Sequence, residues 1–143
     1  MFFSIDLPMD PVAWARARAS GNRFFTAPKQ RQHKAQIQSL VSAKWKHGPI
    51  DGPIAVALIF TIKRPASVSE KKRPLPVVKC DLDNYIKIIL DSLNGITWID
   101  DAQIVTIEAS KVYGKTGNTK IQFTTLGGGN CVQSMCEVQK REG

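Results

Sequence analysis

The spacing of hydrophobic residues along the chain predicts four strands and two helices. Alternating or continuous apolar stretches rich in β-branched residues indicate strands, whereas apolar residues three and four positions apart indicate amphipathic helices. The strands are expected at residues 2–7, 54–62, 104–112 and 120–125, and the helices at 29–45 and 81–94. The last two strands are expected to pair with each other around a turn at 114–118.

This order of elements, βαβαββ, predicts an α+β fold: a small two-layer domain with two helices on a mixed β-sheet of about four strands. The 143 residues, of which 43% are hydrophobic, are enough for one compact core. We therefore expect one domain at residues 1–125 and a flexible, glycine-containing C-terminal tail at 126–143. Residues 16–28 are expected to form an extended segment or hairpin, and residues 63–79 a long basic loop.

The helix expected at 81–94 has the clearest amphipathic pattern in the chain. With residues placed at 100° intervals, its apolar side chains fall within about 100° of one another, which predicts a buried stripe. The adjoining polar face carries Asp83, Lys87, Asp91 and Asn94. One face of this helix is therefore expected to join the core, and the other is available for chemistry.

Basic residues are concentrated in the first part of the chain. The net charge is +8, but residues 1–80 carry 14 Lys and Arg against 4 acidic residues, whereas residues 81–143 carry 6 against 8. This asymmetry indicates a surface that binds a polyanion and a separate acidic site. The basic count alone fits an ordinary solvated surface equally well.

Two acidic groups flank the predicted helix at 81–94. Asp81 and Asp83 lie at its start, and Asp100 and Asp101 lead into the strand that follows it. The short connection lets the chain turn back, so we expect Asp101 to lie beside Asp81 and Asp83. Three converging carboxylates would repel one another unless a cation lay between them, and an all-oxygen ligand set favours Mg²⁺ or Mn²⁺.

Simpler interpretations of the same residues stay open. Asp81 fits an ordinary helix N-cap, and Asp83 and Lys87 have the spacing of an ordinary surface ion pair. Two adjacent acids are also common in turns. On these interpretations the chain is a non-catalytic, basic nucleic-acid-binding module.

Several other classes of protein are excluded. The chain lacks the P-loop sequence, which excludes one class of nucleotide hydrolase, and the residues after Asp81 do not match an EF-hand calcium loop. Its three cysteines include no CxxC pair, which argues against a disulfide framework and against a structural zinc site. We found neither an apolar run of membrane-spanning length nor a secretory signal pattern, so a cytoplasmic location is expected.

The acidic groups and the residues around them resemble the RusA family of Holliday junction resolvases, also called crossover junction endodeoxyribonucleases. The similar stretches are Asp81-Leu82-Asp83-Asn84, Lys87, Asp91-Ser92-Leu93-Asn94-Gly95 and Trp98-Ile99-Asp100-Asp101-Ala102-Gln103. The resemblance implies an α+β homodimer, often encoded by prophages, that resolves four-way DNA junctions by symmetric nicks with Mg²⁺ during recombination and repair. By position, Asp81, Asp83 and Asp101 correspond to the family's metal-binding catalytic acids, and Lys87 to its essential lysine.

The resulting hypothesis is a Mg²⁺-dependent phosphodiesterase that acts on branched DNA, with Mn²⁺ as a substitute ion. Its basic residues would contact the phosphates, since these contacts dominate DNA affinity. The candidates are Arg16, Arg18, Arg23, Lys71, Lys72, Arg73 and Lys79. Phe24 and Phe25 are expected in the core rather than stacked on bases.

Overall fold

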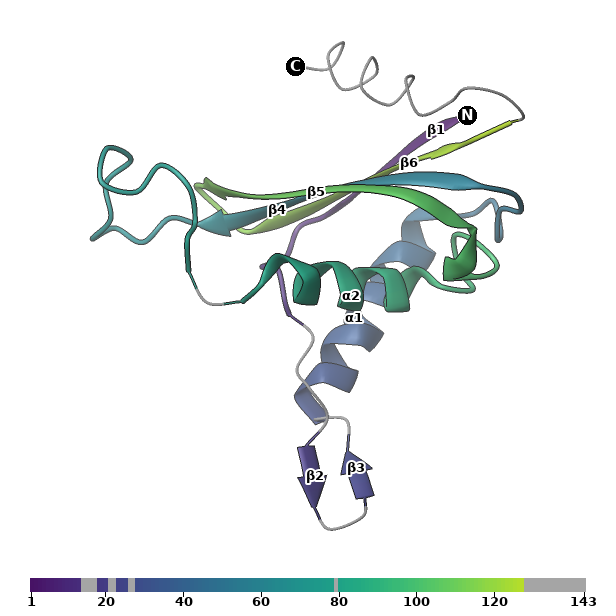
Figure 1. Ribbon diagram of the computed structural model, residues 1–143, viewed down its shortest axis with the longest axis horizontal. Coiled ribbons are helices and arrows are strands. Elements are labelled where there is room, and N and C mark those ends of the chain that lie inside the picture. The colour runs from purple at the N-terminus through teal and green to yellow at the C-terminus, as the bar shows by residue number, and fades with distance from the viewer. Residues whose placement is uncertain (14–17, 21–22, 26–27, 79, 128–143) are drawn as a thin grey trace.

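The computed structural model describes residues 1–13, 18–20, 23–25, 28–78 and 80–127, with only the backbone given for 18–20, 23–25 and 28. Four strands form one sheet in the spatial order β1-β6-β4-β5, and two helices cover one of its faces (Figure 1). The strands are β1 (Phe2–Leu7), β4 (Ile54–Lys63), β5 (Ile104–Gly114) and β6 (Asn118–Thr125), and the helices are α1 (Pro28–Lys44) and α2 (Leu82–Leu93).

The predicted fold class is confirmed. The sheet is mixed, because β4 runs parallel to β5 and antiparallel to β6, and the main elements follow the order βαβαββ. The expected hairpin is also present, as a separate two-stranded sheet of β2 (Arg18–Ser20) and β3 (Arg23–Phe25) that extends away from the main sheet (Figure 1). No helix among the described residues combines the length and apolar character needed to cross a membrane.

The expected pairing of β5 with β6 is wrong. β4 lies between them, so the turn at 115–117 joins two strands that are not neighbours. Burial accounts for this order. Residues 54–58 of β4 are all buried, so this stretch is covered on both faces, as in a central strand. β5 keeps Val105 and Ile107 exposed and takes the edge.

The core lies between the sheet and the helices. Alternate residues of β4, Ile54, Val56, Leu58 and Phe60, point into it, whereas Ala55 and Ala57 point to the other face, where Leu126 packs against them. The alternation follows from the two-residue period of a strand. The fully buried Trp98, from the connection between α2 and β5, contacts this core edge-to-face with Phe123 of β6. The core is therefore continuous with the segment that carries Asp100 and Asp101.

Replacing Leu58 with Ala is expected to lower the free energy of unfolding by about 2–5 kcal/mol, because it leaves a cavity where a side chain only 1% exposed now packs. Val77→Ala, at a loop position 85% exposed, should change that free energy by less than about 0.5 kcal/mol. Urea denaturation of both variants measures the difference. Equal losses would contradict the central position of β4.

Candidate functional site

The start of α2 is fixed by packing around Tyr85. This buried side chain stacks on Phe60 of β4, with ring centroids 5.2 Å apart. Burial, together with the hydrogen bond and charge of Cys80, raises the pKa of Tyr85 to about 12. Asp81 occupies the N-cap position, but its side chain makes no capping hydrogen bond. The N-cap interpretation therefore explains where the backbone of Asp81 lies, but it gives no role to the carboxylate.

Cys80, directly before Asp81, has a backbone φ of 84°. Residues other than glycine rarely adopt this left-handed backbone conformation, and those that do cluster at functional sites. The Cys80 carbonyl accepts a hydrogen bond from Lys111 Nζ at 3.3 Å, and its thiol interacts with Tyr85. These contacts hold the turn that places Asp81 at the start of the helix.

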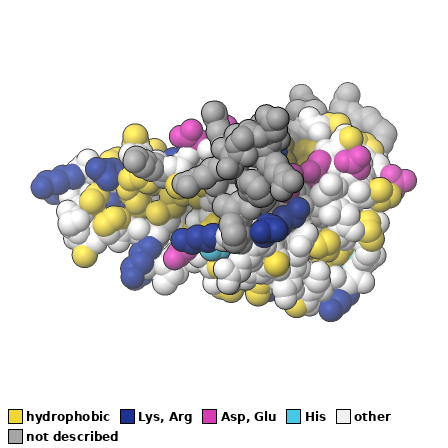
Figure 2. Space-filling model, turned by 90° about the horizontal axis from the view of Figure 1, so that it is seen from below, with side chains coloured by type: hydrophobic (Ala, Val, Ile, Leu, Met, Phe, Trp, Pro, Cys, Tyr) yellow, Lys and Arg dark blue, Asp and Glu magenta, His cyan; other side chains and the backbone are white. Residues whose placement is uncertain are grey.

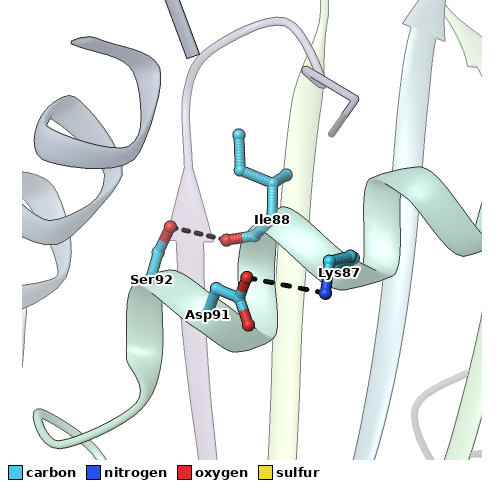
Figure 3. Close-up of polar contacts among 4 residues, drawn as sticks. All are labelled: Lys87, Ile88, Asp91 and Ser92. Carbon is cyan, nitrogen blue, oxygen red and sulfur yellow. Dashed lines mark hydrogen bonds and ion pairs between the residues drawn. The ribbon is translucent and has the colours of Figure 1, made fainter. Parts of the chain in front are cut away.

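The polar face of α2 carries an ion pair. Lys87 and Asp91 are turned toward each other one helical turn apart, with 4.0 Å between Nζ and Oδ2 (Figure 3). The sequence had suggested Asp83 as the partner of Lys87, whereas the ion pair in the structure is with Asp91. Exposed pairs of this spacing contribute only about 0.3–0.5 kcal/mol. The Lys87–Asp91 pair therefore contributes little to stability. Its importance lies in the position that it gives to the two charges on the polar face of α2.

The connection after α2 turns the chain back at the carboxyl end of the helix. Gly95 takes a left-handed conformation, with φ of 81°, and its N–H donates to the Trp98 carbonyl at 2.8 Å. Ile50 fixes the other side of the connection. Its N–H donates to the Thr97 carbonyl at 2.9 Å, and its carbonyl accepts from the N–H of Ile99 at 3.3 Å.

Asp101 lies where this connection enters β5. Its Oδ1 accepts a hydrogen bond from Nε1 of the fully buried Trp98 at 2.7 Å. Partial burial raises the pKa of Asp101 above its usual value, while the Trp98 hydrogen bond lowers it. The nearby charges of Asp91 and Asp100 raise this pKa as well, and that of Lys87 lowers it. The carboxylate of Asp101 is thus an electrostatic neighbour of the Lys87–Asp91 pair.

A short 3₁₀ helix, η1 (Asp101–Gln103), holds the backbone at this point. Asp100 and Gln103 form a capping box: the N–H of Ala102 donates to Asp100 Oδ1 at 3.3 Å, and the N–H of Asp100 donates to Gln103 Oε1 at 2.8 Å. Gln103 Nε2 also donates to the carbonyls of Ile50 and Gly52, each at 2.9 Å. Asp100 therefore has a structural role, and Gln103 ties the turn to residues 50–52.

The structure does not bring the three predicted acids together within one chain. No group of three or more His, Cys, Asp or Glu side chains that could hold a metal ion occurs among the described residues. The reason is geometric. The connection reverses the chain at the far end of α2, and Asp91 lies ten positions after the N-cap Asp81, about 15 Å along the helix axis. The expected proximity of Asp101 to Asp81 and Asp83 is thus replaced by proximity to Asp91.

The residues around Asp101 nevertheless fit a hard divalent cation. Mg²⁺ is usually held by one or two carboxylates, with water and substrate phosphates completing its shell. Asp91 and Asp101 would supply carboxylate oxygens to such an ion, and the charge of Asp91, which raises the pKa of Asp101, is of the kind that a cation relieves. Two carboxylates would be enough for a site that a phosphate completes.

The DNA-binding candidates whose side chains are described, Lys71, Lys72 and Arg73, lie on the loop between β4 and α2. Lys71 and Lys72 are exposed and Arg73 is half-buried, and Lys and Arg side chains lie among apolar ones at the left end of the molecule, where this loop projects (Figures 1 and 2). Arg18 and Arg23 belong to the hairpin, with their side chains outside the described part. Arg16 and Lys79 lie outside the described residues.

The basic loop is anchored by Arg64. Its guanidinium lies 4.3 Å from the centre of the Tyr113 ring and donates to the carbonyls of Arg73 and Pro74, at 2.6 and 3.3 Å. A cavity of about 410 Å³ lies at the base of the loop, lined in part by Arg64, Tyr113 and Lys115. The Arg64 guanidinium is thus engaged by groups of the protein itself, whereas the side chains of Lys71 and Lys72 are exposed.

A family model described as Endodeoxyribonuclease RusA matches residues 8–124, a range that includes both acidic groups and the basic loop. The chain belongs to the RusA family. A curated relative from Bacillus subtilis (strain 168), the uncharacterized protein YqaN, is 30% identical over 129 residues, and the match covers 80% of this chain and 89% of that protein. Membership in the RusA family confirms the resemblance seen in the acidic motifs and indicates an endodeoxyribonuclease.

The sequence pattern does not reveal the roles of some residues that hold or surround Asp101 in this RusA site. Trp98 and Gln103 belong to the motif that carries the family resemblance, but their contacts depend on the fold: one reaches Asp101, and the other reaches residues 50–52. Asp91 was placed on the polar face of the helix without a role. Its spacing of four residues from Lys87 was the available signal.

Asp101→Asn is expected to stabilise the protein near neutral pH. Because the folded-state pKa of Asp101 is raised, the stability linked to this group is present at low pH and is lost as the pH rises through that pKa. Asparagine still accepts the Trp98 hydrogen bond but carries no charge. The gain in thermal midpoint should therefore be largest near neutral pH and fade in acid. A lower midpoint than wild type across the whole pH range would contradict the raised pKa.

Proposed function

We propose that the protein is a Mg²⁺-dependent, structure-specific endodeoxyribonuclease that resolves four-way junctions by paired symmetric nicks during DNA recombination and repair. The observation that carries this proposal is the half-buried Asp101 carboxylate beside Asp91 and Lys87, in a chain of the RusA family. Acids crowded in this way favour a bound cation, and perturbed groups of this kind are typical of active sites.

The proposed ligands of the ion are Asp101 and, on the basis of the family motif alone, Asp81 and Asp83. Because these two lie at the opposite end of α2 from Asp101 within one chain, an ion shared by all three would need them from the second copy of a dimer. Asp91 is added to this set because its charge reaches Asp101. When bound, Mg²⁺ activates water for in-line attack and neutralises charge on the phosphate. Mn²⁺ is the expected substitute because it prefers the same oxygen ligands. The carboxylates themselves orient the ion and keep negative charge at the site before DNA arrives.

Lys87 is proposed to bind the scissile phosphate. Its side chain is exposed, its ammonium nitrogen lies 4.0 Å from Asp91 Oδ2, and its charge reaches Asp101. A lysine acts as a point charge that can follow a phosphate oxygen as charge builds up in the transition state. Its flexible stem lets it exchange Asp91 for a phosphate oxygen at little energetic cost, because exposed ion pairs are weak.

DNA affinity is assigned to the basic residues and not to the acids. Lys71, Lys72 and Arg73 are held on a loop that Arg64 fixes to the end of the sheet. The remaining candidates, Arg16, Arg18, Arg23 and Lys79, keep the same proposed role. Phosphate contacts of this kind provide affinity without sequence preference and weaken steeply with salt.

The acting form is proposed to be a homodimer, since two opposed strands require two active sites related by a two-fold axis. The support is the free edge of the sheet. β5 is an edge strand, and Val105 and Ile107 on it are 61% and 44% exposed, while Ile99, just before the acidic turn, is 57% exposed. Long apolar edge strands are usually covered, and a second copy would place both acidic turns close to one interface.

A synthetic four-way junction and a linear duplex, each incubated with and without Mg²⁺ and resolved on a denaturing gel, test the activity. Symmetric nicks in the junction alone, and only with Mg²⁺, are expected. Asp83→Asn and Asp101→Asn should each reduce cleavage by at least about 100-fold, beyond the loss typical of residues behind a metal ligand. Junction affinity should stay within a few-fold, because it depends on the basic residues.

Asp6→Asn is the matched control, because it removes one exposed carboxylate from β1, at the opposite edge of the sheet. It should cut like the wild type. Tight junction binding without nicks in the wild type would instead establish a non-catalytic binding module. Normal cleavage by an Asn variant would remove that acid from the catalytic set.

Ile107→Glu is expected to convert the dimer to a monomer, because it places a charge at the centre of the proposed apolar interface. Sedimentation velocity at micromolar protein concentration measures the change. Val77→Glu, which introduces the same charge at an exposed apolar position of the basic loop, should leave the dimer intact. A monomeric wild type would contradict the dimer, and a dimeric Ile107→Glu protein would contradict this interface.

A further inference from the structure

Trp98 makes a contact that neither the family motif nor the packing of the core explains. Its ring is fully buried and meets Phe123 edge-to-face at 5.7 Å, as expected of a core residue. Its indole N–H, however, is directed to Oδ1 of Asp101, at 2.7 Å. A buried indole needs an acceptor, and here the acceptor is a carboxylate of the candidate site.

This hydrogen bond holds the Asp101 side chain from the side of the core. A hydrogen bond to a charged acceptor is stronger than one between neutral groups, and an indole has only this one donor. The donor belongs to a ring that the core holds in place, so it cannot follow Asp101 if the carboxylate turns. One carboxylate oxygen is thereby committed to the protein, and Oδ2 is outside this hydrogen bond.

The backbone of Asp101 is fixed independently of its side chain. The capping box between Asp100 and Gln103 closes the turn, and Gln103 ties it to the carbonyls of Ile50 and Gly52. Only the side-chain torsions of Asp101 are left to be set, and the Trp98 hydrogen bond sets them. Metal ligands commonly depend on such partners for their orientation.

We propose that Trp98 is a positioning residue: its buried indole N–H orients the Asp101 carboxylate so that the second oxygen is presented to a divalent cation. The inference rests on the proposed function and adds to it a residue that touches neither the ion nor the DNA. It distinguishes Trp98 from a tryptophan that only fills the core.

The test compares Trp98→Phe with Trp45→Phe. Trp45 is a matched control: it is also buried, it packs on Phe123, and its indole N–H donates to the Gly48 carbonyl at 2.9 Å instead of to an acid. Both variants lose one indole hydrogen bond and keep an aromatic ring. A purely structural role predicts similar effects from the two.

Binding of Mn²⁺ to the full-length protein, followed by the electron paramagnetic resonance signal of the free ion, gives a measurement that does not depend on cleavage. Trp98→Phe should weaken Mn²⁺ binding and raise the Mg²⁺ concentration for half-maximal cleavage by about 10–100-fold, as for other residues that orient metal ligands. Trp45→Phe should change neither. In an Asp101→Ala background, Trp98→Phe should cause no further loss of Mn²⁺ binding, because Trp98 acts through Asp101.

The indole resonances of the wild type provide a measurement without substitution. Addition of Mg²⁺ should shift the indole N–H signal of Trp98 in step with ion binding and leave that of Trp45 in place. If the wild type binds Mn²⁺ and cuts the junction, but Trp98→Phe keeps normal ion dependence or the Trp98 signal does not move, the inference is wrong and the proposed function stands. A wild type that neither binds the ion nor cuts would end the proposed function itself.

Discussion

The connection between α2 and β5 is the constraint on which the rest of the site depends. It is short, it reverses direction at Gly95, and it is hydrogen-bonded to Ile50 on its other side. Because it starts at the end of α2, it delivers Asp101 to the last turns of that helix. The same segment contributes Trp98 to the core, so the position of an acid at the surface is set by packing in the interior. Changes in the packing of the core around Trp98 are thereby linked to the position of the Asp101 carboxylate.

The fold places acidic and basic groups on separate parts of the chain. The acids come from the helix and the turn that follows it, whereas Lys71 and Lys72 come from a loop anchored at the end of the sheet by Arg64. Under the proposed function, this separation would let the acidic site attract a cation while the loop attracts phosphates. The raised pKa of Asp101 reflects the energetic cost of the arrangement, because burial and the charges of Asp91 and Asp100 disfavour the charged form of that residue. A bound cation would compensate for this cost.

Much of the fold could be predicted from the sequence, because β4 is a nearly continuous run of apolar residues, α2 has a strong helical periodicity, and Gly95 marks the end of the helix. The order of strands could not be predicted in the same way. The turn at 115–117 looks like that of a hairpin, and only the two-sided burial of β4 shows that this strand separates β5 from β6. For the site, the residue types were identified by spacing and by the RusA motif. The distances between these residues could not be predicted. The length of the connection limits how far apart its two ends can lie, but it does not say beside which turn of α2 Asp101 is placed.

The arrangement of the acids suggests how ion binding and DNA binding depend on each other under the proposed function. Asp91 and Asp101 offer a divalent ion fewer oxygens than a closed protein site does, and Lys87 competes for one of them. Mg²⁺ tolerates this because it retains water and readily takes phosphate oxygens. A phosphate that reaches the site would add ligands for the ion and also draw Lys87 away from Asp91. Under the proposed function, the site would therefore become complete only when DNA is in place, which would favour cleavage of bound substrate.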